Sequence, residues 1–184
     1  MAKLANMILK LFGWKLIGEL PSINKFVVII APHTSNWDFF VFILVKFACK
    51  VKVSFIGKHT IFIGPIGWVL RKLGGIPVKR SSSNNVVTAI VHEFSQREQM
   101  IFALSPEGTR SYLDHWKSGF YHIAKEANVP VVTAFLDVKT KNIGWGPIFY
   151  LTDDKHEDLK LIGSFYQDKI GFKHDKYSKV RFLD

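Results

Sequence analysis

The sequence predicts one α/β domain over residues 1–184, with a mostly parallel central sheet flanked by helices. Short apolar segments rich in β-branched residues, at 26–31, 100–104 and 129–136, have the length and composition of buried strands. Longer apolar segments such as 39–48 alternate with them, and this alternation favours parallel strands joined by crossover helices. With 48% hydrophobic residues, the chain is long enough to bury one substantial core.

Residues 1–17 predict a basic amphipathic helix. Apolar residues recur there at helical spacing, with lysines between them: Leu4, Met7, Ile8, Leu11 and Phe12, and Lys3, Lys10 and Lys15. Such a helix can pack on the domain or anchor the protein to a membrane surface, and both interpretations remain open. Residues 18–24 predict a turn region that precedes the first core strand.

The motif-bearing core, 26–136, begins with a strand that ends at Pro32. Proline cannot continue a central strand, because it has no N–H to donate. The segment TSN at 34–36 follows and offers three favourable N-cap residues, so the apolar run 39–48 predicts a helix.

The remaining elements continue the alternation. A Gly-Pro pair predicts the start of a helix over 65–73, and a Gly-Gly pair its end. Apolar composition and capping residues predict the others: strands 51–57, 76–78 and 147–151, and helices from 81–85 to about 97, from 117–119 to 127 and from 153–154 to about 169. The tail 171–184 has weak signals and is a candidate for a mobile segment.

The charge balance predicts an anionic partner. The chain has 25 Lys and Arg against 15 Asp and Glu, a net charge of +10. No nucleic-acid-binding motif occurs, and basic residues lie among apolar ones, as in WVLRKL at 68–73, which favours an anionic membrane surface over nucleic acid. No stretch reaches the ~20 apolar residues of a membrane span. We therefore expect a peripheral protein at the cytoplasmic face of a membrane.

The cysteine content fits a reducing compartment. Cys49 is the single cysteine and can form no internal disulfide. Its apolar neighbours favour burial in the core over a nucleophilic role. The N-terminal segment has no small-residue cleavage site after its apolar part, so the sequence predicts no secretory signal. No set of His, Cys, Asp and Glu shows ligand spacing, so it predicts no metal site.

His33 and Asp38 are the first candidates for chemistry. Within one helix, residues five apart point about 140° away from each other. If His33 lies in a turn and Asp38 in the first helical turn, the chain folds back and the two side chains can meet. A carboxylate on one imidazole nitrogen leaves the other free to act as a base. Alternatively, His33 satisfies backbone groups at the turn and Asp38 interacts with the helix dipole.

A second group of polar residues follows another predicted strand. The segment SPEGTRS at 105–111 offers Gly108 for close backbone approach and Arg110 for phosphate. Arg80 also follows a predicted strand. Because functional turns of a parallel sheet lie at the carboxyl ends of its strands, we expect an anion site beside His33.

Four blocks occur in order: HTSNWD at 33–38, GIPVKR at 75–80, SPEGTRS at 105–111 and VPVV at 129–132. Together they resemble the motifs of the glycerolipid acyltransferases, typified by lysophosphatidate and glycerol-3-phosphate acyltransferases. The first matches the family's His-four-residues-Asp motif and the third its Pro-Glu-Gly-Thr block. Lys117 is similar to the lysine of the family's short Lys-x-Gly pattern.

The resemblance implies phospholipid biosynthesis, by transfer of an acyl group from acyl-CoA or acyl carrier protein to a hydroxyl of a lysophospholipid such as 1-acyl-glycerol-3-phosphate. It implies that His33 is the base and Asp38 its partner, with no acyl-enzyme and no cofactor besides the acyl donor. It implies that the acceptor's phosphate end is bound by the following residues: Arg80, Glu107, Gly108, Thr109, Arg110 and Lys117. Glu107, itself anionic, would orient an arginine or accept from the acceptor's hydroxyl.

Two other functions stay open at the level of sequence. A thioester hydrolase would use the same base on water. A non-catalytic basic protein would bind a membrane surface by charge alone. The acyl chain itself needs an apolar groove, for which Phe39, Phe40, Phe42 and the segment 61–69 are candidates. The latter segment could also dip into a bilayer while the basic residues at 71–72 meet lipid phosphates.

Overall fold

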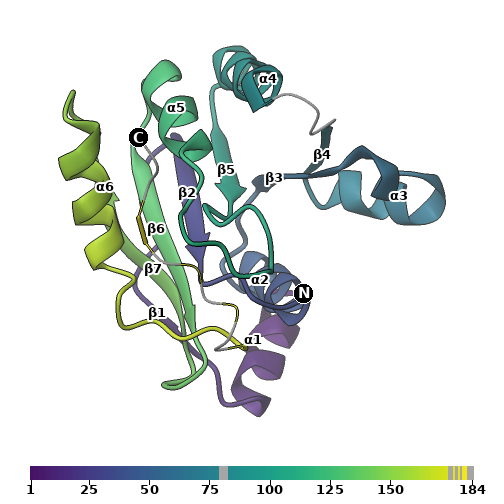
Figure 1. Cartoon of the computed structure of the whole chain (residues 1–184). Helices are drawn as coiled ribbons and strands as arrows, with labels where there is room; N and C mark the ends of the chain where they lie inside the picture. Colours follow the sequence, from purple (N-terminus) through teal and green to yellow (C-terminus); the bar gives the residue numbers. More distant parts are fainter. Residues whose placement is uncertain (79–82, 174–175, 177, 179, 182–184) are drawn as a thin grey trace.

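The computed structural model describes residues 1–78, 83–173, 176, 178 and 180–181, in which strands alternate with helices (Figure 1). In chain order its elements are α1 Ala2–Leu11, β1 Lys15–Ile17, β2 Lys25–Ala31, α2 Trp37–Ala48, β3 Val53–Lys58, the 3-10 helix η1 His59–Ile61, α3 Gly64–Lys72, β4 Gly75–Val78, α4 Ser83–Gln96, β5 Met100–Leu104, α5 Gly119–Glu126, β6 Val131–Asp137, β7 Asn142–Phe149 and α6 Lys155–Ser164.

One sheet of seven strands runs through the molecule in the order β1-β7-β6-β2-β5-β3-β4. The central strand β2 pairs in parallel with β5 and β6. β3 is parallel to β5 and β4, and β1 is parallel to β7. β6 and β7 are antiparallel. The predicted α/β domain with a mostly parallel sheet flanked by helices is confirmed.

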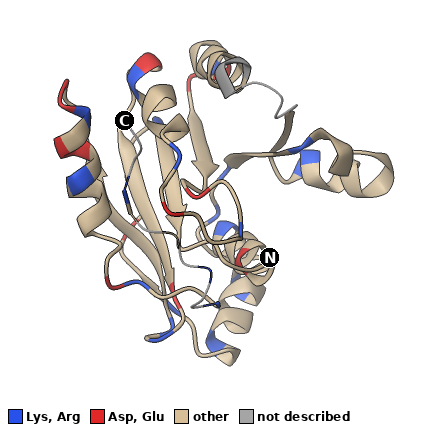
Figure 2. Cartoon of the chain, in the orientation of Figure 1, with Lys and Arg blue, Asp and Glu red and all other residues tan. Residues whose placement is uncertain are grey.

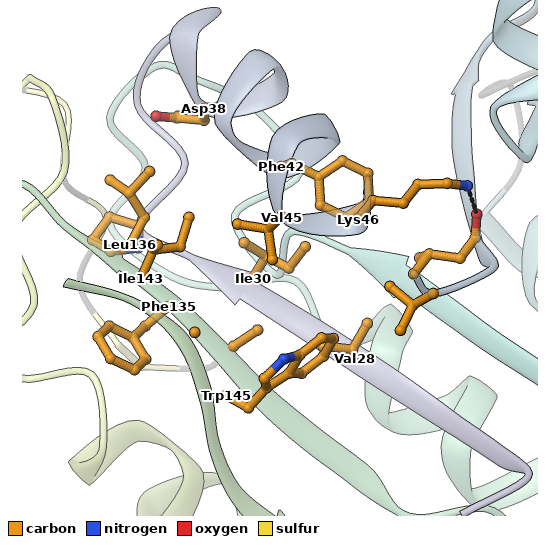
Figure 3. A pocket seen from close by; sticks show the side chains of 15 residues that line it. Val28, Ile30, Asp38, Phe42, Val45, Lys46, Phe135, Leu136, Ile143 and Trp145 are labelled. Atoms are coloured by element: carbon orange, nitrogen blue, oxygen red, sulfur yellow. Dashed lines mark hydrogen bonds between the residues drawn. The ribbon is translucent and has the colours of Figure 1, made fainter. Parts of the chain in front are cut away.

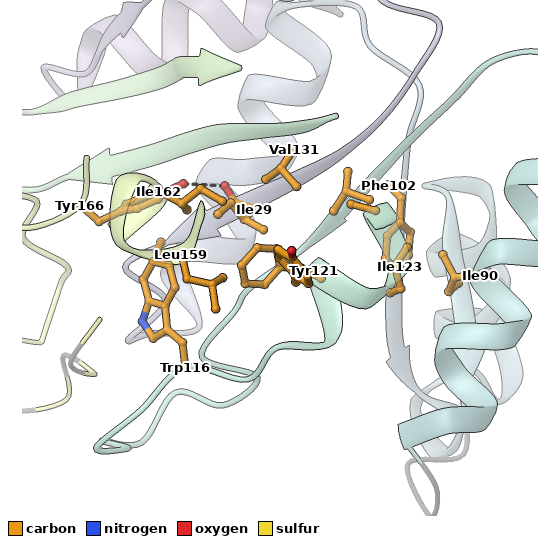
Figure 4. Close-up of a cluster of buried hydrophobic side chains, with 14 of the residues drawn as sticks. Ile29, Ile90, Phe102, Trp116, Tyr121, Ile123, Val131, Leu159, Ile162 and Tyr166 are labelled. Carbon is orange, nitrogen blue, oxygen red and sulfur yellow. Dashed lines mark hydrogen bonds between the residues drawn. The ribbon is translucent and has the colours of Figure 1, made fainter. Parts of the chain in front are cut away.

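Helices cover both faces of the sheet. On one face α4, α5 and α6 contribute Ile90, Ile123 and Ile162 to a single apolar cluster (Figure 4). The helices α1 and α2 lie on the other face (Figure 1). They contribute Leu9 and Val45 to another cluster. The sheet is therefore the middle of three layers.

The central strand is buried on both faces. Val27 and Ile29 of β2 belong to the cluster under α4, α5 and α6, whereas Phe26 and Val28 belong to a cluster on the opposite face. A strand buried on both faces needs no polar alternation, which explains why the segment is a continuous apolar run.

The N-terminal helix is shorter than the predicted range 1–17. It ends at Leu11 because Gly13 turns the chain with φ of 77°, and Lys15–Ile17 then pairs with β7 as an edge strand. Ala5 and Leu9 are buried, so the helix packs on the domain. Among the described residues, none of the helices combines the length and the apolar composition that crossing a bilayer requires.

Two elements near the C-terminus also differ from the prediction. The strand predicted at 147–151 is β7, which starts at Asn142, because pairing with β6 and β1 satisfies the backbone of a segment rich in glycine. The helix predicted to about 169 ends at Ser164. The chain turns inward there, since Tyr166 is fully buried and donates its hydroxyl to main-chain carbonyls of β2 and β6.

Part of the tail 171–184 contacts the domain. Phe172 packs edge-on against Trp14, and the N–H of Lys173 donates to Thr34 Oγ1 at 3.1 Å. Residues 174–175, 177, 179 and 182–184 lie outside the described residues. For them the expectation of a mobile tail stays a prediction.

Candidate active site

Two loops meet at the carboxyl ends of neighbouring central strands of the sheet. β2 leads into residues 33–38 and β5 leads into residues 105–111. Because β2 and β5 are parallel neighbours, both loops leave the sheet at the carboxyl ends of their strands. The backbone N–H of His33 donates to Glu107 Oε2 at 3.0 Å, so the loops are in direct contact.

His33 and Asp38 form a pair in which the imidazole Nδ1 lies 3.1 Å from Asp38 Oδ2. The chain folds back between them because α2 begins only at Trp37, after a turn. A carboxylate at Nδ1 favours the tautomer that carries its proton there, which leaves Nε2 as an acceptor. The His33 side chain is 29% exposed, so a substrate can reach the ring.

The carboxylate of Asp38 is buried and held by the turn that precedes it. The backbone N–H groups of Thr34 and Ser35 donate to Oδ2 at 2.7 and 2.8 Å. Asp38 thus satisfies donors at the start of α2, where Asn36 makes no side-chain capping bond. Its other oxygen, Oδ1, has no hydrogen-bond partner among the described residues. The carboxylate is therefore held in place beside the imidazole of His33.

Glu107 is fully buried, so its carboxyl group is not exposed to a substrate that arrives from solution. Oε2 accepts the N–H of His33, and Oε1 has no hydrogen-bond partner in the described part of the chain. Burial raises the pKa of Glu107 to about 7; the bond from His33 opposes this rise, and the charge of Asp38 adds to it. Its carboxyl group thus positions the backbone of His33. The expectation that Glu107 orients an arginine or accepts from the acceptor's hydroxyl stays a prediction, since Arg80 lies outside the described residues.

The predicted anion-binding residues after β5 lie at the surface beside this pair. Gly108 has a φ of 64°, and a Cβ atom there would come within 2.9 Å of the Lys117 side chain. Lys117 therefore lies across the loop. Arg110 donates a hydrogen bond to Asn36 Oδ1, which links the two loops a second time. Thr109 between them is partly exposed. Arg110 and Lys117 thus place positive charge at the loop that contacts His33.

Arg80, together with Lys79, lies outside the described residues. β4 ends at Val78 in the same sheet, two neighbours away from β5. The role expected for Arg80 stays a prediction.

A cavity of about 40 Å³ lies between α2 and the sheet (Figure 3). Most of its lining is apolar: Val28, Ile30, Pro32, Phe42, Val45, Val51, Val53, Ala134, Phe135, Leu136, Ile143, Gly144 and Trp145. Two ionisable side chains, Asp38 and Lys46, also line it. The catalytic candidate Asp38 therefore borders an apolar space.

Of the candidates for an acyl groove, Phe42 lines this cavity, while Phe40 is largely exposed. Sequence reasoning missed Lys46, whose Nζ donates to the carbonyls of Val53 at 3.2 Å and Leu73 at 2.6 Å. Partial burial lowers its pKa. The only signal in the sequence was one charge inside an otherwise apolar helix.

Within the described ranges, no three His, Cys, Asp or Glu side chains are arranged to hold a metal ion.

Comparison with known proteins identifies the class. Residues 17–137 match the Acyltransferase family, and the matched region contains both loops of the site. The chain belongs to the acyltransferase family.

Two plant proteins are similar to this chain in sequence. The chain is 33% identical over 153 residues to the chloroplastic 1-acyl-sn-glycerol-3-phosphate acyltransferase BAT2 of Brassica napus, covering 78% of this chain and 41% of that protein. It is 31% identical over 120 residues to the chloroplastic 1-acyl-sn-glycerol-3-phosphate acyltransferase LPAT1 of Arabidopsis thaliana, covering 62% of this chain and 32% of that protein. The chain thus spans well under half the length of these relatives.

A solved structure has the same fold. The crystal structure of the 1-acyl-sn-glycerophosphate acyltransferase PlsC of Thermotoga maritima superposes with a TM-score of 0.63 at 16% identity, covering 89% of this chain and 74% of that one. At this identity the likeness concerns the fold alone.

Proposed function

We propose that this protein transfers a fatty acyl group from a thioester to the free hydroxyl of a lysophospholipid such as 1-acyl-glycerol-3-phosphate, as a step of phospholipid biosynthesis. The observation that carries the proposal is the His33–Asp38 pair at the edge of an apolar cavity. The two plant relatives, both 1-acyl-sn-glycerol-3-phosphate acyltransferases, support the choice of acceptor.

His33 Nε2 removes the proton from the acceptor hydroxyl while that oxygen attacks the thioester carbonyl. Asp38 stabilises the imidazolium that forms. When the tetrahedral intermediate collapses, the C–S bond breaks and His33 returns the proton to the leaving thiolate. The acyl group passes directly to the acceptor, so no acyl-enzyme forms and no cofactor besides the acyl donor takes part.

The donor is acyl-CoA or acyl carrier protein, and its acyl chain enters the cavity beside Asp38. Apolar cavities favour methylene groups over water. At about 40 Å³ the space holds only part of an acyl chain as it stands. A long chain therefore requires side chains on α2 to move away from the sheet.

The phosphate end of the acceptor binds near Gly108, Thr109, Arg110 and Lys117, with Arg80 as a further ligand. Arg110 offers a planar guanidinium that suits phosphate geometry. The reaction takes place at the cytoplasmic face of a membrane, where a peripheral enzyme meets its lipid substrates.

The test is a reaction with long-chain acyl-CoA and a panel of lysophospholipids, following free thiol and lipid product together. The wild type should release thiol only with an acceptor present, and His33→Ala should lower kcat by about 10²–10⁴-fold. Asp38→Asn should also lower kcat. Thiol release with free fatty acid and no acceptor dependence would indicate a hydrolase. Full activity of His33→Ala would overturn the proposed chemistry.

A further inference from the structure

The α3 lobe, residues 53–78, presents an apolar surface that nothing in the described chain covers. It comprises β3, η1, α3 and β4 and extends from the body of the molecule at the end of the sheet (Figure 1). Helices of globular domains normally bury their large apolar residues. α3 does the opposite: its only buried residue is Gly67. Ile63, Ile66 and Trp68 are 74%, 68% and 59% exposed.

This exposure is built into the packing of the lobe. Phe62 is buried, and its backbone lies so close to Gly67 that a Cβ atom there would come within 2.1 Å of the Phe62 carbonyl carbon. Arg71 Nη1 donates to the Phe62 carbonyl at 2.8 Å. The helix is therefore packed against Phe62 through Gly67 and Arg71, and this packing leaves Ile66 and Trp68 on its exposed side.

The charge around this surface has one sign. The sequence contains no Asp or Glu from residue 39 to residue 92. The basic residues of the described lobe are Lys58, Arg71 and Lys72 (Figure 2). Lys72 Nζ lies 4.0 Å from the centre of the Trp68 ring, so a cation and an aromatic ring stand side by side at the surface. Large exposed apolar patches mark interaction sites, and tryptophan with lysine is typical of membrane interfaces.

We propose that the α3 lobe is a membrane-docking element for anionic lipid bilayers. Ile63, Ile66 and Trp68 enter the boundary between headgroups and acyl chains, and Lys58 and Lys72 contact lipid phosphates. The chemistry argues for lipid over a protein partner, because the charge is positive throughout and the apolar residues are aliphatic with an interfacial aromatic. The contact does not depend on the reaction proposed above.

The first measurement is co-sedimentation with vesicles of phosphatidylglycerol and phosphatidylcholine, without substrate. Ile66→Ser with Trp68→Ser should lower binding about tenfold or more. Added salt and Lys72→Gln should weaken binding to anionic vesicles and leave binding to vesicles of pure phosphatidylcholine unchanged. The matched control is Tyr150→Ser with Leu161→Ser, which removes two exposed large side chains, the second on α6 at the side of the molecule away from α3 (Figure 1), and should bind like the wild type. None of these side chains is buried, so thermal unfolding should be unchanged.

The second measurement locates the contact by quenching tryptophan fluorescence with brominated lipids. Trp68→Phe should remove most of the quenching, and Trp37→Phe, which changes the other largely exposed tryptophan, should retain it. Three results would overturn the proposal. They are the reverse pattern of quenching, wild-type binding by the variant Ile66→Ser with Trp68→Ser, and a dimer of the wild-type protein that this variant converts to a monomer. A protein that binds vesicles through α3 yet transfers no acyl group would contradict only the proposed function.

Discussion

At the scale of single residues, the site depends on two carboxyl groups with different tasks. Asp38 accepts from two backbone N–H groups and faces the imidazole of His33, so it sets the ring's orientation. Glu107 accepts from the backbone N–H of His33, so it sets the position of the turn. One acts on the side chain of His33 and the other on its main chain.

The stability of the protein should depend on pH through Glu107. Its pKa rises from 4.5 to about 7 on folding, because the carboxyl group is buried. Between these values the folded state keeps a proton that the unfolded state has lost, so stability falls as pH rises from about 4.5 to about 7. Above about pH 7, ionisation of the buried carboxyl group lowers the free energy of unfolding by the full amount, roughly 3 kcal/mol.

The variant Glu107→Gln should remove this dependence while keeping an acceptor for the His33 N–H. Urea unfolding of both proteins at pH 5 and pH 8 measures the difference. The wild type should lose stability relative to the variant at the higher pH, by up to the roughly 3 kcal/mol given above. A constant difference between the two proteins would show that Glu107 is ionised throughout.

At the scale of elements, α2 has two tasks: its N-terminus carries Asp38 and its buried face covers the cavity. Val45→Phe should fill part of that space. We expect kcat/KM for long-chain acyl-CoA to fall about tenfold or more, and short-chain acyl-CoA to be affected less. Val45→Ala, which enlarges the cavity, is the matched variant and should not reduce long-chain activity to the same extent. Equal losses for all chain lengths would argue against acyl binding there.

The packing of α3 on Phe62 predicts an effect on stability. In Gly67→Ala the new Cβ would collide with the Phe62 backbone, so the free energy of unfolding should fall by about 1–3 kcal/mol. Gly119→Ala is the control, because a Cβ atom at this helix position meets nothing within 4 Å. It should change stability by less than about 0.5 kcal/mol. Equal effects in urea unfolding would contradict the packing described here.

At the scale of the whole molecule, the N-terminal segment is part of the structural core. Leu9 and Trp14 share an apolar cluster with Val41 and Val45 of α2. Deletion of residues 1–17 would expose this cluster and remove β1, so the free energy of unfolding should drop by ~3 kcal/mol or more. Met7→Ser, on the exposed side of α1, should stay within about 0.5 kcal/mol of the wild type. A truncated protein that unfolds like the full chain would show that the helix is dispensable for folding.

The architecture could be predicted because its main determinants are local. The apolar run at 26–31 and the capping segment at 34–36 predict a strand, a turn and a helix, and these place His33 and Asp38 together. The edge strands could not be predicted from their own composition. Lys15–Ile17 and Asn142–Phe149 are strands because each finds pairing partners that are distant in the chain.

The site was predictable in its surface residues and less so in its interior. The motif spacing indicates His33 and Arg110, but no pattern says that Glu107 points inward, since burial is decided by how β5 packs beside β2. The cavity is likewise assembled from α2, β2, β6 and β7, and its lining residues are ordinary core positions in the sequence.

His33 and Glu107 are 74 positions apart in the chain. During translation, a growing polypeptide that ends before Glu107 contains His33 and Asp38 but lacks the carboxyl group that accepts the main-chain N–H of His33. The hydrogen bond between His33 and Glu107 is a non-local contact that depends on the pairing of β2 with β5. The candidate site is therefore complete only after the fifth strand has paired with the second.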